Sequence, residues 1–556
     1  MIDLSVLRNS GKFAIAGGRP RLALVHHGFR TTELELIDGR KTRFSARYAS
    51  LGLLNLARSL QVDFENGRIP YEPELKYFDE DSYDDDDELL RAVVEWLRPA
   101  PARFVLAGVY TLAVERTAAL LSKLDPTDVC IVVGGAHPTV APRIDYAHIV
   151  VRGEGGVPLR HLLTRLFDAS FGDGPDARGI CYQLDGHLHV SAPAFDSSLA
   201  TIPAPAFAYD LSQSRSDFIN RPQDRWWKAT GKHPQIYVCT QSCRARCTFC
   251  STYLIHGRLV SRPVALIAQD LDFIIDEHGH DSLQFFDDDL LQHDELDALM
   301  ELLQRRRIAW SCNARAEFMT PERARQMFGA GCKKVFLGVE SFDQRSLDYY
   351  RKGTTVEMNR QAIHALDDAG IAVVCGYIIG APHDTLDSIL ADIDRMLELP
   401  IFFLSGSILT PDIGSVEFLR ARKTIPALRL LGDGGSDFNL KPRPELFGAG
   451  PPYGLPTVCT SLSKAELNEL YELAECSFFL RESTAERVTR LSPPDQLELI
   501  AEWFQWNTAR AEKLAQTARL DIVRERAAAV LSGQPHRPAS QVPAVSPLPA
   551  AFELGA

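Results

Sequence analysis

Three cysteines on one short loop constrain this chain of 556 residues more than any other feature. Cys243, Cys247 and Cys250 have the spacing C-x3-C-x2-C and directly follow an apparent strand at 235–238. Thiolates gathered on a loop bind iron–sulfur clusters or zinc, and structural zinc takes four protein ligands whereas this loop offers three. The spacing therefore favours a [4Fe-4S] cluster with one iron left for an outside ligand. Cys239 is excluded because no third cysteine follows it at the right distance.

The composition fits a cytoplasmic protein of several domains. The chain contains 45% hydrophobic residues, which is enough for sizeable cores. It has no run of eighteen apolar residues and no basic-then-apolar start, so we expect neither a membrane span nor export. Eleven cysteines, an odd number, argue against a disulfide framework. The formal net charge of −13 offers no electrostatic footprint for nucleic acid, so we expect no nucleic-acid partner.

Strands and helices alternate before the cysteine loop. Such an alternation predicts an α/β fold with a parallel, doubly wound sheet. The acidic string at 79–88 predicts a solvated turn and the negatively charged start of a helix, where the helix dipole favours carboxylates. The expected strands are 21–26, 75–78, 104–109, 129–133 and 148–151, with helices at 47–60, 114–123 and 158–167.

Glycine-rich motifs end three of these strands. The motifs GVYT, GGAHPT and RGEGG begin at Gly108, Gly134 and Arg152. A doubly wound sheet binds ligands at the carboxyl ends of its strands, and glycine there lets the backbone approach a bulky ligand. The motifs therefore predict a binding site at this edge of the sheet.

About six strand–helix units, beginning with the strand before the cysteine loop, predict an open (β/α)6 barrel, which binds ligands at its strand ends. The expected strands are 235–238, 282–286, 308–312, 335–339, 371–379 and 401–409. Four consecutive strands end in the motifs FFDDDL, CNAR, GVES and GYIIGAP. Because these ends are in register with the cysteine loop, we expect them to share one site with it.

The cysteine spacing, with the aromatic Phe249 before the last cysteine, resembles the radical S-adenosylmethionine (SAM) superfamily over about 235–409. The resemblance implies that SAM chelates the open iron of the cluster. It also implies that acidic residues bind the SAM amino group and that an arginine binds the SAM carboxylate. The residues assigned in this way are Phe249, Asp287, Asp288, Asn313, Arg315, Glu340, Ser341 and Ile379.

The earlier strand-end motifs resemble the Rossmann- or flavodoxin-like cobalamin-binding domain of one large radical SAM class, over about 20–210. Gly156 departs from the pattern, because the family more usually has a second acidic residue there. No D-x-H-x-x-G motif supplies a histidine to cobalt. The resemblance assigns cobalamin contacts to Tyr110, Thr111, Gly134, Gly135, His137, Thr139, Gly153, Glu154 and Gly155.

Together the two resemblances imply a cobalamin-dependent radical SAM methyltransferase of class B. Such an enzyme adds a methyl group to an unactivated carbon of a small molecule or peptide, using a 5′-deoxyadenosyl radical and methylcobalamin. An electron donor such as flavodoxin or ferredoxin is the implied partner, and no side chain is assigned a catalytic role. A ring contraction, cyclisation or rearrangement with the same cofactors stays open, as does a non-catalytic corrinoid or iron–sulfur protein.

The expected domain limits follow from the same patterns. Gly and Pro at 431–460 predict a long loop, and amphipathic spacing at 461–533 predicts a C-terminal helical domain. The Pro- and Ala-rich end predicts a disordered tail. The predicted order is a cobalamin-binding domain at 1–210, a linker at 211–234, a radical SAM core at 235–430, the loop, the helical domain and a tail at 534–556.

Overall fold

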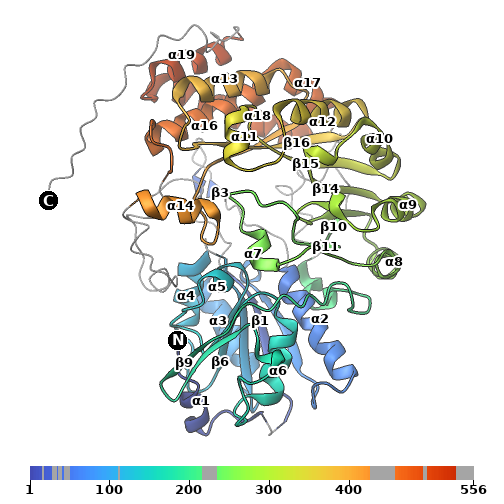
Figure 1. Ribbon diagram of the computed structural model, residues 1–556, viewed down its shortest axis with the longest axis vertical. Coiled ribbons are helices and arrows are strands. Elements are labelled where there is room, and N and C mark those ends of the chain that lie inside the picture. Colours follow the sequence, from blue (N-terminus) through green and yellow to red (C-terminus); the bar gives the residue numbers. More distant parts are fainter. Residues whose placement is uncertain are drawn as a thin grey trace, which may run out of the picture. The chain divides into compact units, whose positions relative to one another are not determined.

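The computed structural model describes residues 1–15, 18–27, 34–35, 41–42, 50–110, 113–215, 234–425, 457–491 and 497–533. The chain divides into two compact units, whose elements can be followed in Figure 1. Unit 1 comprises 1–313, 329–332 and 412–454, and unit 2 comprises 314–328, 333–411 and 455–556. Most of the predicted linker and loop, and the predicted tail, lie outside the described residues.

Unit 1 contains a seven-stranded sheet in the order β4-β1-β5-β6-β7-β8-β9. The first five strands in that order are parallel, as the alternation of strands and helices predicts. The chain order reverses between β1 and β5, and doubly wound sheets open a crevice for ligands at such a point. The parallel strands are β1 (Arg21–His26), β4 (Glu74–Asp79), β5 (Arg103–Gly108), β6 (Cys130–Gly134) and β7 (Ile149–Val151).

Successive side chains on β1 point to opposite faces of the sheet, and both sets are buried. Ala23 and Val25 belong to a core cluster that residues of α3 and α4 complete. Leu22 and Leu24 alternate with them and are fully buried too. Helices α2 and α6 pack against each other. The helices are α2 (Leu51–Glu65), α3 (Asp86–Leu97), α4 (Val114–Leu121), α5 (Ala136–Val140) and α6 (Gly156–Arg165).

Two antiparallel strands, β8 (Ile180–Leu184) and β9 (His187–Val190), extend the sheet at one edge. The beginning of the chain fixes the turn between them. The Asp3 carboxylate accepts hydrogen bonds from the backbone N–H of Asp185 at 3.1 Å and of Gly186 at 2.7 Å. The sheet is therefore mixed, whereas the sequence pattern predicts parallel strands alone.

The acidic string forms a partly buried network instead of a fully solvated turn. Glu80 is buried, and Arg116 binds it at 3.0 Å. Arg116 also binds Asp86 at 3.2 Å, and Nε2 of His27 lies 3.2 Å from the same carboxylate. The guanidinium compensates the buried charge, which is costly without such a partner. The predicted helix start is present, because Asp85 caps α3.

Three parallel strands follow in unit 1 and pair in the order β10, β13, β14. A short hairpin of β11 and β12 brackets the cysteine loop. The strands are β10 (Pro234–Tyr237), β11 (Thr240–Gln241), β12 (Val260–Ser261), β13 (Ser282–Phe285) and β14 (Ala309–Arg315), whose last two residues belong to unit 2. The helices of this part are α7 (Thr252–His256), α8 (Val264–Leu271), α9 (Leu296–Arg306) and α14 (Val416–Thr424).

A buried ion pair joins this part of unit 1 to the segment that follows β9. Arg262 binds the two carboxylate oxygens of Asp270 at 2.6 and 3.0 Å. The same guanidinium donates to the backbone carbonyl oxygens of Leu199 and Ile202, each at 2.9 Å. The Tyr237 hydroxyl on β10 donates to Asp270 at 2.5 Å. Both charges are thus paired and hydrogen-bonded, which is the condition for burying them.

Unit 2 contains three parallel strands, which pair in the order β15, β16, β17. All six strands predicted for the second half of the chain are therefore present, and the (β/α)6 barrel that they suggest stays a prediction. The strands are β15 (Cys332–Glu340), β16 (Ala372–Ile379) and β17 (Phe403–Ile408). The helices among them are α10 (Pro321–Gly329), α11 (Gln344–Tyr349), α12 (Val356–Asp368) and α13 (Leu386–Leu397).

Helices expected after residue 461 are present in unit 2. Helix α16 begins with a capping box of Ser463 and Glu466, and it packs against α18 and α19. Within the described ranges, no helix is both long and apolar enough to cross a membrane. The helices are α16 (Lys464–Phe479), α17 (Glu482–Leu491), α18 (Leu497–Thr517) and α19 (Asp521–Leu531).

We expect Arg262→Met to lower the free energy of unfolding by about 3–5 kcal/mol, because it leaves the Asp270 carboxylate buried without its cation. Urea denaturation followed by circular dichroism measures the change. The control is Asp276→Ala, which removes a more exposed carboxylate that lies 3.0 Å from Arg306. Exposed pairs contribute about 0–1 kcal/mol, so equal effects of the two substitutions would contradict the prediction.

Candidate functional site

A cavity of about 600 Å³ lies in unit 1 at the carboxyl ends of β1, β5, β6 and β7. Helix α2 and the segments on both sides of the cysteine loop complete its wall. Leu106 and Val132, from two neighbouring strands, make part of the wall apolar. The cavity lies where the glycine motifs predict a site, at the edge of the sheet where doubly wound folds bind ligands.

Two glycines let the backbone itself form the edge of the cavity. Gly153 has a φ of 76°, and a Cβ there would lie 2.0 Å from the carbonyl oxygen of Ala194. Gly135 has a φ of 101°, and a Cβ there would lie 3.3 Å from the backbone of Val109. Only glycine fits the first position without a shift of the backbone. The predicted cobalamin contacts that line the cavity are Tyr110, Gly134, Gly135, Gly153, Glu154 and Gly155.

Thr139 and His137 lie behind the cavity wall. The Thr139 hydroxyl donates to the carbonyl oxygen of Gly135 at 2.7 Å and accepts from the backbone N–H of Gly153 at 2.8 Å. It therefore holds two glycine loops together instead of lining the cavity. His137 is fully buried and does not line the cavity either. Thr111 lies outside the described residues.

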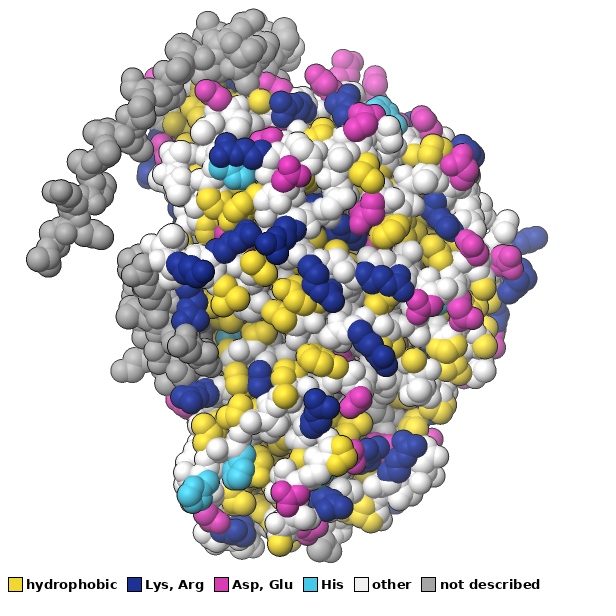
Figure 2. All heavy atoms as spheres, in the orientation of Figure 1, with side chains coloured by type: hydrophobic (Ala, Val, Ile, Leu, Met, Phe, Trp, Pro, Cys, Tyr) yellow, Lys and Arg dark blue, Asp and Glu magenta, His cyan; other side chains and the backbone are white. Residues whose placement is uncertain are grey.

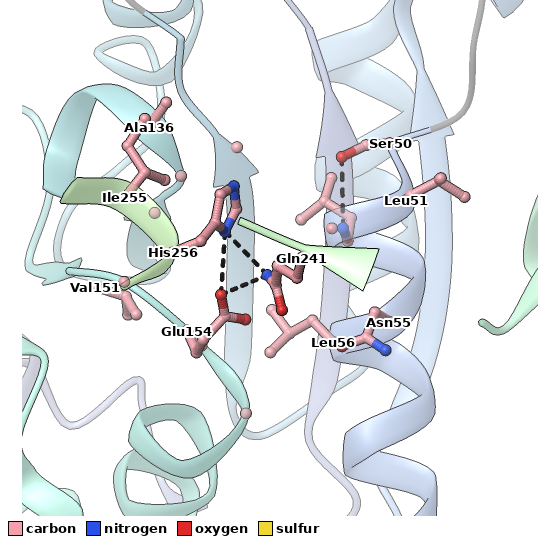
Figure 3. A pocket seen from close by; sticks show the side chains of 18 of the residues that line it. Ser50, Leu51, Asn55, Leu56, Ala136, Val151, Glu154, Gln241, Ile255 and His256 are labelled. Carbon is pink, nitrogen blue, oxygen red and sulfur yellow. Dashed lines mark hydrogen bonds and ion pairs between the residues drawn. The ribbon is translucent and has the colours of Figure 1, made fainter. Parts of the chain in front are cut away.

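Three polar side chains meet at one wall of the cavity (Figure 3). Gln241 on β11 donates to Oε1 of Glu154 at 2.5 Å, and Nδ1 of His256 lies 3.2 Å from the same oxygen. Gln241 Nε2 and His256 Nδ1 are 2.9 Å apart. Glu154 follows β7, whereas Gln241 and His256 flank the cysteine loop. These three residues, the Glu154 cluster, therefore connect the glycine edge of the cavity to the cysteine loop.

The Glu154 cluster sets the charge state of His256. Burial lowers the pKa of His256, but the hydrogen bond and the negative charge of Glu154, together with the charge of Asp288, raise it above the ordinary histidine value. Asp288 also lines the cavity, and burial raises the pKa of its carboxyl. The wall thus carries a histidine whose pKa lies above its ordinary value and a carboxyl whose pKa also lies above its ordinary value.

Several polar residues outside the predicted set also line the cavity. His26 ends β1, and its Nδ1 lies 2.9 Å from Oδ2 of the buried Asp79, which fixes the ring. Ser50 and Asn55 come from the beginning of α2, where Ser50 is the N-cap. A capping serine is visible in the sequence. Its position facing the strand ends is not visible there, because it depends on how α2 packs.

The cysteine loop offers three thiols for a metal centre. Cys247 is buried, whereas Cys243 and Cys250 are half-buried. The backbone N–H of Ala245 donates to Cys243 Sγ at 3.4 Å, and that of Thr252 donates to Cys250 Sγ at 3.5 Å. Donors of this kind stabilise the thiolate form, which is the form that binds metals.

The three thiols lie farther apart than the ligands of one tetrahedral zinc ion. In a group of side chains that could hold one metal ion, the ligand atoms all lie within 4.8 Å of one another. Among the described residues, the sulfurs of the three cysteines do not form such a group. Sulfurs at about 2.3 Å from one tetrahedral zinc would lie closer together than that. Cys239 is fully buried, and burial raises the pKa of its thiol well above the ordinary value. Burial also raises the pKa of Cys250, so the exclusion of Cys239 as a ligand stays a prediction from the spacing.

The two acidic residues predicted to bind the SAM amino group have different surroundings. Asp287 is fully buried, and its Oδ1 accepts from the Thr240 hydroxyl at 2.6 Å and from the backbone N–H of Cys239 at 3.0 Å. Burial raises the pKa of Asp287 to about 6, although these hydrogen bonds lower it. Asp287 thus holds the chain that enters the cysteine loop. Asp288 lines the cavity and accepts from the Thr252 hydroxyl at 3.2 Å.

Arg315 and Glu340 belong to unit 2, and both form ion pairs there. Arg315 binds Glu317 at 2.5 Å, and Glu340 binds Lys352 at 2.7 Å. All four side chains are at most about one-fifth exposed. A carboxylate ligand would therefore compete with Glu317 for the Arg315 guanidinium. Contact of Arg315 and Glu340 with SAM stays a prediction.

The remaining predicted SAM contacts lie in or beside strand ends, except for one residue of the cysteine loop. Asn313 donates its amide to a backbone carbonyl oxygen just after β13 at 2.9 Å. Ser341 donates to Asp392 at 2.9 Å, and Ile379 is buried at the end of β16. Phe249 is half-buried inside the cysteine loop. Their contact with SAM also stays a prediction.

Figure 2 shows many Lys and Arg side chains among hydrophobic ones on the face that it draws. The net charge of −13 therefore does not describe every face of the protein. The expected absence of a nucleic-acid partner rests on that net charge, and it stays a prediction.

The family model of the radical SAM superfamily matches residues 237–396. The matched segment begins on β10, includes the cysteine loop and ends within α13. It is a radical SAM domain, and such a domain implies a [4Fe-4S] cluster and SAM. The prediction of these two cofactors is thereby confirmed.

Known proteins resemble the chain beyond this segment. An uncharacterized methyltransferase of Pyrococcus horikoshii is 27% identical over 312 residues, which cover 54% of this chain and 64% of that protein. An anaerobic magnesium-protoporphyrin IX monomethyl ester cyclase of Rubrivivax gelatinosus is 25% identical over 287 residues, which cover 50% of each. The chain thus spans less than two thirds of the length of either relative.

A solved structure with a similar fold is that of OxsB, a cobalamin-dependent S-adenosylmethionine radical enzyme with aqua-cobalamin bound. It is 16% identical with a TM-score of 0.61, covering 90% of this chain and 73% of that one. A sequence identity this low supports a similar fold only. The chain resembles cobalamin-dependent radical SAM enzymes, as its cysteine and glycine motifs predict.

We expect Gly153→Ala to destabilise the protein by more than about 2 kcal/mol, because the methyl group would overlap the Ala194 carbonyl oxygen and the backbone would be strained. The midpoint of urea unfolding measures the change. Gly186→Ala is the matched control, since Gly186 has a φ of 79° and open space where its Cβ would be. Gly186→Ala should lower the free energy of unfolding only by the backbone strain, about 1–2 kcal/mol. A control as damaging as Gly153→Ala would refute a steric role of Gly153.

We expect the stabilisation from the charged His256–Glu154 contact to be present below the ordinary histidine pKa of about 6.5 and to be lost as pH rises through the raised pKa of His256. Glu154→Gln should therefore lower the pKa of His256. Titration of the ¹³C-labelled histidine signals by NMR measures it, and His256→Gln identifies the signal. Glu115→Gln, an exposed control outside the cavity, should leave this titration unchanged. An unchanged titration in Glu154→Gln would speak against the contact.

Proposed function

We propose, on the premise that residues 237–396 form a radical SAM domain, that this chain is a cobalamin-dependent radical SAM methyltransferase acting on an unactivated carbon. One observation carries the proposal: unit 1 holds both the cysteine loop and a glycine-edged cavity at the strand ends of a doubly wound sheet. The Glu154 cluster connects the two. Methyl transfer through a radical needs a site for the methyl carrier beside a site for SAM.

The cavity has features that suit a corrin ring. Its apolar walls suit the faces of a large, flat macrocycle. The backbone at Gly135 and Gly153 lines the cavity, and a Cβ at either position would meet the backbone of Val109 or Ala194. Ser50 and Asn55 offer polar partners for the amide groups at the rim of the ring. In this proposal these four residues and Glu154 hold cobalamin.

Cys243, Cys247 and Cys250 would hold the cluster in this proposal, and Asp288, which lines the cavity, accepts a hydrogen bond from Thr252 just after the cysteine loop. When bound, the reduced cluster supplies the electron that cleaves SAM to a 5′-deoxyadenosyl radical, and cobalamin supplies the methyl group. The protein's own residues bind, orient and exclude water. No side chain is assigned a step at the reacting carbon.

The substrate in this proposal is a small molecule, such as a natural-product intermediate, or a peptide. The Pyrococcus horikoshii relative is named an uncharacterized methyltransferase, and this name supports methyl transfer as the reaction class. A low-potential electron carrier of the flavodoxin or ferredoxin class reduces the cluster. We place the reaction in the cytoplasm, where a reducing environment preserves thiolate ligands.

A second function uses the same cofactors without methyl transfer. The Rubrivivax gelatinosus relative is a cyclase, and this favours ring formation or another radical rearrangement as the alternative. The products distinguish the two functions. Methyl transfer yields S-adenosylhomocysteine and a methylated product together with 5′-deoxyadenosine, whereas a rearrangement yields 5′-deoxyadenosine alone.

We expect anaerobically reconstituted protein to bind four irons per chain and to cleave SAM reductively, and Cys247→Ala to lose SAM cleavage by at least a hundredfold because the cluster loses a ligand. Chromatography of 5′-deoxyadenosine and S-adenosylhomocysteine measures both reactions. Cys239→Ala is the matched control, since it removes a buried cysteine four positions before the first ligand. Retained cleavage in Cys247→Ala, or equal loss in Cys239→Ala, would contradict the assignment of ligands. A reconstituted protein that binds no corrinoid would contradict the cobalamin half of the proposal.

A further inference from the structure

Gln292 lies beside the cysteine loop in unit 1 and contacts a cluster ligand directly. It ends the short 3-10 helix Leu290–Gln292 that follows β13, and it is buried. Its amide Nε2 lies 3.2 Å from Cys243 Sγ, within hydrogen-bonding distance for sulfur. No pattern in the sequence singles out this residue, which stands 49 positions after the cysteine that it contacts.

The surroundings of the Gln292 amide fix its orientation. Nε2 has two hydrogens and two acceptors, the Cys243 sulfur and Oδ2 of the buried Asp289 at 2.8 Å. The amide oxygen accepts the backbone N–H of Arg244 at 2.8 Å. A flipped amide would place its oxygen against a carboxylate and a thiolate, and its NH2 group against another N–H. The network therefore aims an N–H group at the sulfur.

We propose that Gln292 is a positioning residue that raises the reduction potential of the cluster through its hydrogen bond to Cys243. This inference rests on the proposed function, because it requires the [4Fe-4S] cluster. Reduction adds one electron and so adds negative charge to the cluster and its thiolates. A hydrogen-bond donor on a ligand sulfur stabilises the more negative state, and hydrogen bonds to sulfur are among the groups that set cluster potentials.

The electron in this step comes from a low-potential one-electron carrier, or from dithionite in the assay. This electron is added to the oxidised cluster, and no bond of the protein forms or breaks. The Ala245 N–H also donates to the Cys243 sulfur, at 3.4 Å, and stays in place when Gln292 is changed. We therefore expect a partial fall in the potential, and we expect the cluster to remain.

The test compares the reconstituted chain of 556 residues with its Gln292→Met variant, in which methionine keeps the length of the side chain but has no N–H. Redox titration monitored by electron paramagnetic resonance measures the cluster potential, and iron analysis measures cluster content. We expect four irons in both proteins and about a tenfold fall in the ratio of reduced to oxidised cluster at a fixed potential, equal to about 59 mV for one electron. Gln235→Met, on the buried strand before the cysteine loop, is the matched control and should leave the ratio unchanged.

Each outcome has one meaning. A Gln292→Met protein with four irons and an unchanged potential overturns the role of Gln292 and leaves the proposed function standing. An unaltered protein that assembles no four-iron cluster overturns both. If Gln292→Met assembles no cluster, the titration is made on Gln292→Asn, whose shorter amide withdraws from the sulfur. An unchanged potential in that protein overturns the inference, and a lower one supports it.

Discussion

The organisation of unit 1 depends on one buried charge pair, Arg262 with Asp270. Two ions taken out of water cost several kcal/mol each, so such a pair persists only when neighbouring polar groups also bind it. Here the carbonyl oxygens of Leu199 and Ile202 and the hydroxyl of Tyr237 do so. These partners come from the segment after the first sheet and from the strand before the cysteine loop. The loop with the three thiols is thus anchored on both sides.

Several polar residues at strand ends support the backbone and do not line the cavity. The Thr139 hydroxyl connects two glycine loops. The Asp287 carboxylate binds the chain at Thr240, and the Gln292 amide binds the loop at Arg244. Each of these groups holds a neighbouring segment of the chain in position, and a cofactor could reach that segment. Precise placement of ligands requires such support, because a loop held only at its ends would let them move.

Local patterns predict much of the fold and less of the site. The parallel strands, the thiols and the glycine edge at Gly153 follow from spacing and periodicity within a few dozen residues. The predicted strands do not include the antiparallel pair β8–β9, although Asp185 and Gly186 form a dipeptide that signals a hairpin. The meeting of Glu154 with His256 joins positions 102 residues apart. A contact over that distance depends on tertiary packing, which no local pattern records.

The contact of Asp3 with the turn between β8 and β9 has a consequence for how the protein is made. Its partners, Asp185 and Gly186, stand more than 180 positions later in the chain. At about 5–20 residues per second, a ribosome needs roughly ten to forty seconds to reach them. Throughout that interval the Asp3 carboxylate lacks these two partners. The contact of Asp3 with this turn therefore forms only after every strand of the sheet up to β8 has been translated.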